Sequence, residues 1–202
     1  MSDFEITVRV NMKLEDLFTY LNENNFIFHQ SFRCIDIFMI KKEQLVNKIT
    51  LNDLNNCIIL RKLIFKDKTL KYMVIKNKEY DENGNIIKSN QMNIDIQYVT
   101  KEKSRLLANG YVELIKMNDH CYTYSKNNHE FIIEHIDELG TFIEFENMNY
   151  DSNTKNGNSI NDLIELFNSF NIDYDHNDYF CKKAWLLIKK QKSQYIKRNN
   201  LF

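Results

Sequence analysis

The chain has 202 residues, of which 43% are hydrophobic and 13% aromatic, so it is long and apolar enough to bury a sizeable core. Its net charge is -1, from 27 basic and 28 acidic residues, which gives no bulk attraction to a nucleic-acid polymer or to a membrane. We therefore expect any charged site to arise from a local arrangement of side chains.

The first residues lack the basic and apolar regions of a signal peptide, and no apolar run of about 18 residues occurs. A cytoplasmic protein without a membrane segment is therefore expected. The cysteines are widely separated and form no C-x-x-C pair, and the histidines lack metal-ligand spacing. We expect reduced, mostly buried thiols at Cys34, Cys57, Cys121 and Cys181.

Strand patterns dominate the first two thirds of the chain, and helical spacing follows near the end. The strands are expected at 4–10, 31–40, 57–67, 70–81, 86–99, 111–125, 129–137 and 140–149. Helices are expected at 14–25, at 100–109, where Asn109-Gly110 ends the helix, and at 160–172 and 178–196. Asn83-Gly84 indicates a hairpin turn, 41–56 is ambiguous, and 147–159 reads as a polar loop. Eight strands favour an antiparallel barrel, because closure removes exposed edges.

Charged residues interrupt these apolar strands on six of the expected segments. They are Glu5, Arg9, Arg61, Lys76, Lys116, Glu134, Glu144 and Glu146. One interpretation is that they face solvent on a two-layer sheet. The other is a barrel with a polar interior, which needs water, mutual pairing or a ligand, because unpaired buried charges are costly. A phosphate-rich ligand with a divalent cation suits such an interior, since bases bind phosphate oxygens and carboxylates bind the cation.

Over roughly residues 4 to 185, the order of these features resembles the CYTH superfamily, the triphosphate tunnel proteins. The most specific match is a carboxylate, a turn, L-G-x-F and E-x-E, which fits Glu134, Leu139-Gly140, Phe142, Glu144 and Glu146 in register. Other matches are Asp36 with Phe38, Leu60-Arg61, Lys76, Gly110-Tyr111 and Lys116. Four positions depart from the family pattern by exchanging charged residues for uncharged ones: Thr7, Gln91, Asn93 and Asn118. Arg9 replaces a lysine, which keeps the charge and changes the donor geometry.

The resemblance implies an α+β fold in which an antiparallel eight-stranded β-barrel, the triphosphate tunnel, has flanking α-helices. It implies one domain over residues 1–202, with C-terminal helices at about 159–198 on or beyond the barrel. Glu5, Glu144 and Glu146 would bind Mg²⁺ or Mn²⁺, and Arg9, Arg61, Lys76 and Lys116 would bind the triphosphate. The catalytic set would be Glu5, Arg9 and Glu134.

Three functions remain open from the sequence. The first is an enzyme acting on ATP, tripolyphosphate or thiamine triphosphate, either as an adenylate cyclase or as a triphosphatase. The second is a tunnel that binds a nucleotide or polyphosphate without chemistry, which the four uncharged replacements favour. The third is a scaffold with ion-paired strand faces. A small-molecule triphosphate is the expected partner, with no nucleic-acid polymer and no membrane, and a homodimer is compatible with the sequence.

Overall fold

The computed structural model of the chain describes residues 5–46, 49–51, 54, 57–80, 86–146 and 160–199. The hairpin turn predicted at Asn83-Gly84 and the loop predicted at 147–159 lie outside these residues. The strands are β1 (Glu5–Arg9), β2 (Ile27–Lys41), β3 (Ile58–Ile64), β4 (Thr69–Tyr80), β5 (Ile86–Asp95), β6 (Tyr111–Lys126), β7 (His129–Ile136) and β8 (Gly140–Glu146). The helices are α1 (Leu14–Glu23), η1 (Lys42–Val46), α3 (Val99–Ala108), α4 (Ile160–Asn168) and α5 (Lys183–Asn199).

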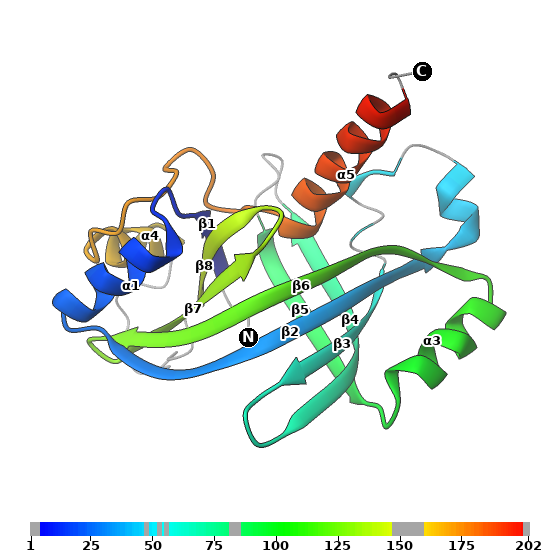
Figure 1. Ribbon diagram of the computed structural model, residues 1–202, viewed down its shortest axis with the longest axis horizontal. Helices are drawn as coiled ribbons and strands as arrows, with labels where there is room; N and C mark the ends of the chain where they lie inside the picture. The colour runs from blue at the N-terminus through cyan, green and yellow to red at the C-terminus, as the bar shows by residue number, and fades with distance from the viewer. Residues whose placement is uncertain are drawn as a thin grey trace.

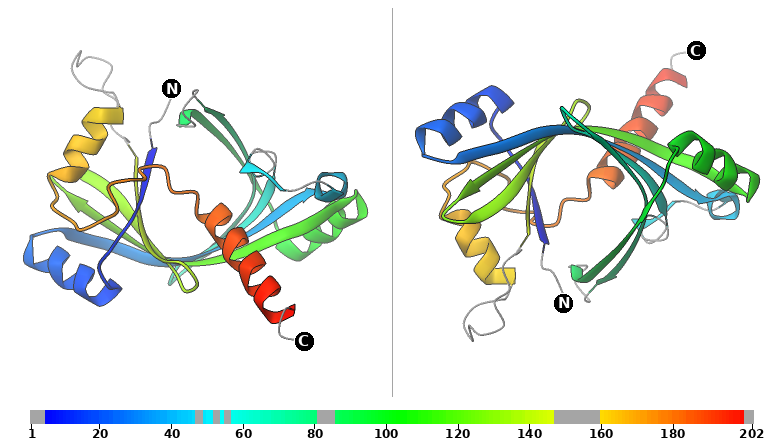
Figure 2. Two further views of the ribbon diagram at one scale, coloured as in Figure 1. Left: turned by 90° about the horizontal axis from the view of Figure 1, so that it is seen from above. Right: turned by 90° about the horizontal axis from the view of Figure 1, so that it is seen from below.

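The strands form one antiparallel sheet in the order β1-β8-β7-β6-β2-β3-β4-β5. The sheet curls strongly, so that β4 and β5 turn back toward the side that holds β1 (Figures 1 and 2). No ladder joins the edge strands β1 and β5 within the described residues, so hydrogen bonds do not close the sheet there. The predicted eight-stranded antiparallel fold with flanking helices is confirmed, and its curled form is compatible with a barrel-like tunnel.

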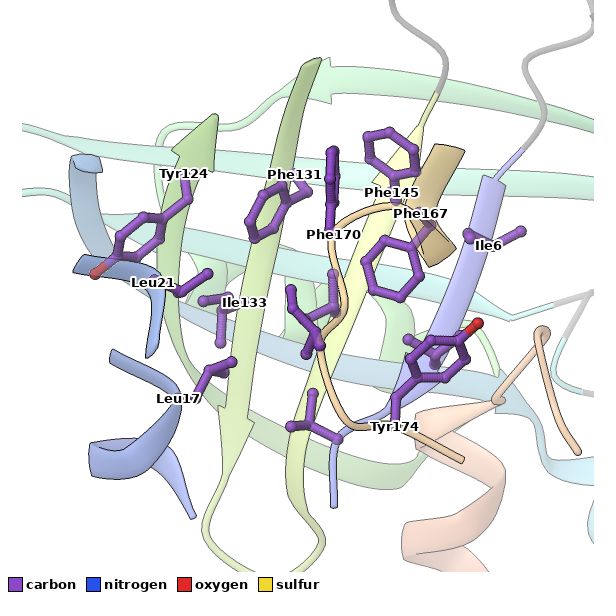
Figure 3. Close-up of a cluster of buried hydrophobic side chains, with 14 of the residues drawn as sticks. Ile6, Leu17, Leu21, Tyr124, Phe131, Ile133, Phe145, Phe167, Phe170 and Tyr174 are labelled. Carbon is purple, nitrogen blue, oxygen red and sulfur yellow. The ribbon is translucent and has the colours of Figure 1, made fainter. Parts of the chain in front are cut away.

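The outer face of the sheet carries most of the apolar core. On β1, β7 and β8, alternate residues pack against α1 and α4, and aromatic rings fill the centre of this cluster (Figure 3). Phe131, Phe145, Phe167 and Phe170 are almost completely buried there, and their ring centroids lie 5.8 to 6.0 Å apart in the contacting pairs. Helix α3 covers the outer face of β2 and β3, where Leu106 packs with two buried strand residues, Met39 and Leu60.

The inner, concave face holds a second apolar cluster that the start of α5 covers. Leu187 and Ile188 pack there with residues of β2, β6 and β8, among them Met117 and Phe142. The segment before α5 is extended, because the backbone of Thr7 accepts a 2.9 Å hydrogen bond from Cys181 N and donates one of 2.9 Å to Tyr179 O. This pairing covers the outer edge of β1. The helix predicted from residue 178 therefore begins at residue 183.

Candidate functional site

Strands β1 and β8 bring acidic residues together on the inner face. Their ladder pairs Glu5 with Glu146 and Thr7 with Glu144. Directly paired residues of antiparallel strands project to the same face, with Cβ atoms about 4.5 to 5.5 Å apart. Thr7 Oγ1 also donates a 3.4 Å hydrogen bond to Glu5 Oε1. We call these four positions the acidic corner; the side chain of Glu146 lies outside the described part of the structure, and the register fixes its backbone position.

A lysine from α5 lies against this corner. Nζ of Lys183 is 2.7 Å from Glu144 Oε2 and also contacts Glu134 Oε2. Glu134 reaches the inner face from β7, where it pairs with Phe142, two residues before Glu144. The three side chains are between 12% and 19% exposed, so the ammonium lies between two carboxylates with little contact with water. The structure thus brings Glu134 and Glu144 together, and a cation of the chain itself lies between them.

The guanidinium of Arg61 belongs to the same face, on β3. It donates from Nε and Nη2 to the two carboxylate oxygens of Asp36, which is buried on β2. Burial lowers the pKa of Arg61, but the charge and hydrogen bonds of Asp36 raise it, with help from Glu144, so that it lies above its usual value. Arg61 therefore keeps its charge and lies within electrostatic reach of the acidic corner.

Asp119 of β6 is an unexpected acid on the inner face. It is 2% exposed, and its Oδ1 has no hydrogen-bond partner among the residues that the structure describes. Burial raises the pKa of this carboxyl to about 7; Asp36 and Glu138 add to the rise, while Lys183 and Arg61 oppose it. Asp119 therefore adds an acid to the middle of the face on which a triphosphate would lie.

Arg9 stands at the rim of the inner face. It pairs with Phe142 in the β1–β8 ladder, and its Nη2 donates a 2.5 Å hydrogen bond to the carbonyl of Leu139. Its guanidinium carbon lies 5.8 Å from the centre of the Phe142 ring. Arg9 is exposed and therefore lies at the edge of the inner face rather than within it.

The structure does not place either of the two predicted phosphate-binding lysines, Lys76 and Lys116, at the acidic corner. Lys116 is exposed on the outer face, because its neighbours Ile115 and Met117 point inward to the cluster under α5. The prediction that Lys116 lines the interior therefore needs correction: strand alternation turns it away. The backbone of Lys76 pairs with Gln91 of β5, and its side chain lies outside the described part.

Sequence reasoning missed Lys183 and Asp119. The sequence carries no signal for the lysine, because the helix predicted from residue 178 places Lys183 inside the helix, whereas α5 begins at Lys183. A signal existed for Asp119, which interrupts the inward series of Ile115, Met117 and Cys121. Among the described side chains, no group of three or more His, Cys, Asp or Glu residues is placed to hold a metal ion. Glu146 stands outside that search.

No helix in the described ranges has the length and apolar character needed to cross a membrane. No family model matches the chain, and no curated protein matches it by sequence.

Solved structures do match the fold. PH1819 from Pyrococcus horikoshii OT3 is similar with a TM-score of 0.65 and 16% identity, over 93% of this chain and 99% of that one. A conserved hypothetical protein from Pyrococcus furiosus has a TM-score of 0.60 at 17% identity, over 86% and 95% of the two chains. A candidate adenylate cyclase from Vibrio parahaemolyticus has a TM-score of 0.60 at 16% identity, over 89% and 95%. The chain therefore shares its fold with these proteins, among them a candidate adenylate cyclase, as the resemblance in its sequence predicts.

Proposed function

We propose that this protein is a metal-dependent enzyme that acts on the triphosphate group of a small molecule inside the curled sheet. The observation that carries the proposal is the β1–β8 register, which sets Glu5, Glu144 and Glu146 on neighbouring positions of one face. Arg61 lies close enough to Glu144 for that carboxylate to raise its pKa. A carboxylate wall and a fixed guanidinium on the same face suit a ligand that carries phosphate and a divalent cation.

The acidic corner fits Mg²⁺ or Mn²⁺ in its chemistry, because both ions prefer oxygen ligands and keep several waters. Glu5, Glu144 and Glu146 would hold the ion, with the Thr7 hydroxyl beside them. When bound, the ion would offset the negative charge of the phosphates and align them for displacement at phosphorus. The donor set is acidic enough for one such ion, although Lys183 already engages Glu144.

The basic residues of the face would orient the triphosphate. Arg61 has five N–H donors, and its pairing with Asp36 uses two of them and fixes the plane of the guanidinium. Arg9 would meet the ligand at the rim, and Lys76 of β4 is a further candidate from its sequence match. Glu134, with Glu5 and Arg9, completes the proposed catalytic set. The reaction is either attack of a ribose hydroxyl on the α-phosphorus, which releases pyrophosphate, or attack of water, which releases phosphate.

The test is a panel of ATP, tripolyphosphate and thiamine triphosphate, each with Mg²⁺ and with Mn²⁺, assayed for both phosphate and pyrophosphate. We expect turnover with at least one substrate, lost in Glu144→Gln and kept in Glu165→Gln, which removes an exposed carboxylate from α4. Pyrophosphate released from ATP together with cyclic AMP identifies a cyclase, and phosphate identifies a triphosphatase. Absence of turnover across the whole panel with both metals would overturn the proposal.

A second candidate is a protein that binds a nucleotide or polyphosphate without converting it. The pairing of the inner charges favours it: Lys183 engages both Glu134 and Glu144, and Asp36 engages Arg61. Such a binder would keep recognition at the rim and lose the electrostatic balance that chemistry at phosphorus needs.

Calorimetry separates the two candidates. A binder should bind tripolyphosphate with Mg²⁺ and yield no product after prolonged incubation, whereas an enzyme should yield product. Ligand at 100 times its dissociation constant should raise the free energy of unfolding by about 2.7 kcal/mol in either case. Absence of both binding and stabilisation would leave the scaffold interpretation.

A further inference from the structure

Lys183 makes the contacts that a bound cation would make. Its ammonium touches Glu134 from β7 and Glu144 from β8, two carboxylates that belong to different strands. Without a cation between them, two such poorly hydrated carboxylates would repel each other. The lysine therefore supplies a positive charge at a place where the acidic corner would otherwise attract a metal ion.

The backbone anchors this lysine on both sides. Two residues earlier, Cys181 N donates a 2.9 Å hydrogen bond to the carbonyl of Thr7 on β1. One turn later, Leu187 and Ile188 are 1% and 5% exposed in the inner cluster. The start of α5 is thus attached to the same strand that carries Glu5, which holds the backbone of Lys183 beside the carboxylates.

The position of Lys183 in the helix supports the same conclusion. It is the first residue of α5, where the partial positive charge of the helix N-terminus disfavours a cation. The attraction of Glu134 and Glu144 therefore outweighs that repulsion. An uncharged residue could begin α5 equally well, so the charge of Lys183 is explained by its contact with the two carboxylates.

We propose that Lys183 is a resident cation that occupies the Glu134–Glu144 part of the site and excludes a divalent ion from it. This inference rests on the proposed function only in treating Glu5, Glu144 and Glu146 as metal ligands. It implies that at most one divalent ion binds, at the Glu5–Glu146 side of the acidic corner. Replacing the ammonium by an uncharged side chain of similar length opens a second ion site between Glu134 and Glu144.

The experiment titrates the protein with Mn²⁺ alone and follows free Mn²⁺ by electron paramagnetic resonance, without any triphosphate. Lys183→Met should bind one more Mn²⁺ per chain than the wild type. Its affinity for Mn²⁺ between Glu134 and Glu144 should exceed any binding there in the wild type by at least about tenfold, since a positive charge within a few ångströms has been removed. Lys183→Arg should behave as the wild type. Lys189→Met, which removes an exposed lysine from the same helix, should also leave Mn²⁺ binding unchanged.

Equal Mn²⁺ binding by Lys183→Met and the wild type would overturn the inference. Where Lys183→Met does not fold, the comparison moves to Lys183→Gln, which also removes the charge and keeps both carboxylates, and this variant should again bind one more Mn²⁺ than the wild type. The proposed function fails separately. If no variant turns over a triphosphate but Lys183→Met still gains an Mn²⁺ site, the inference about Lys183 is supported and the proposed enzyme activity is refuted.

Discussion

Asp36 and Arg61 face each other across the β2–β3 ladder and form two parallel hydrogen bonds, Nε to Oδ1 at 2.8 Å and Nη2 to Oδ2 at 2.6 Å. The side chain of Asp36 is 1% exposed, whereas that of Arg61 is 22% exposed. The buried Asp36 therefore positions Arg61, which reaches the open part of the inner face. Such a two-point contact fixes the guanidinium plane before any ligand binds.

Removing the charge of Asp36 should destabilise the protein. Asp36→Asn keeps the shape of the side chain but leaves a mostly buried guanidinium without its counter-charge, and we expect a loss of about 3 kcal/mol in the free energy of unfolding. Urea unfolding measures this loss. Asp95→Asn, which changes an exposed acid of β5, is the matched control and should change stability by less than about 0.5 kcal/mol. Equal small losses in both variants would show that the pair contributes little.

The buried Asp119 should make stability fall as pH rises. Burial raises its pKa from 3.8 to about 7 in the folded protein. Between these two values the folded state binds more protons than the unfolded chain, so the free energy of unfolding decreases as the pH increases through this window. The stabilising contribution is complete below about pH 4 and is lost above about pH 7.

Asp119→Asn should remove this dependence. We expect the variant to be more stable than the wild type at pH 8, by on the order of 2 to 4 kcal/mol, and to lose this advantage as the pH approaches 4. Urea unfolding of both proteins across this range gives the difference directly, and the titration of all other groups cancels to first order. A stability difference that does not change with pH would contradict the assignment.

The sequence predicts most strands because alternation and β-branched residues are local properties. It also finds Glu144 and Glu146, since a two-residue spacing along one strand fixes their common face. The same rule turns Lys116 outward once Ile115 and Met117 point inward. Which of the two alternating sets of β6 residues faces inward depends on packing against α5, which is distant in sequence.

The contact of Lys183 with Glu134 could not be predicted for a similar reason. It depends on the extended segment before α5, which the sequence suggests to be helical from residue 178. Hydrogen bonds to the edge of β1 hold this segment straight as far as Cys181. Local propensity is weak against such pairing, so tertiary contacts decide where the helix begins.

The cysteines should resist alkylation in the folded protein. All four are buried, and burial raises the pKa of Cys34 and Cys121 above the usual value and that of Cys181 to about 12. At this last value, a thiol has about a thousandfold less thiolate at pH 8 than an ordinary cysteine. Ellman's reagent should therefore react slowly with native protein and with four thiols after unfolding in guanidinium. Rapid labelling of one thiol in the native state would place that cysteine at an accessible surface.

The turn before β8 should not tolerate a side chain at Gly140. Its φ is +100°, a conformation that residues with a Cβ atom rarely adopt, and a Cβ there would stand 3.9 Å from Nη2 of Arg9. Space is sufficient, so backbone strain dominates, and Gly140→Ala should lower the free energy of unfolding by about 1 to 3 kcal/mol. Thermal and urea unfolding measure this, with Asp137→Ala, an exposed change in the same turn, as the control. Unchanged stability would show that the turn relaxes to another conformation. Because this turn supplies the Leu139 carbonyl that accepts a hydrogen bond from Arg9, Gly140→Ala should also weaken tripolyphosphate binding at the rim.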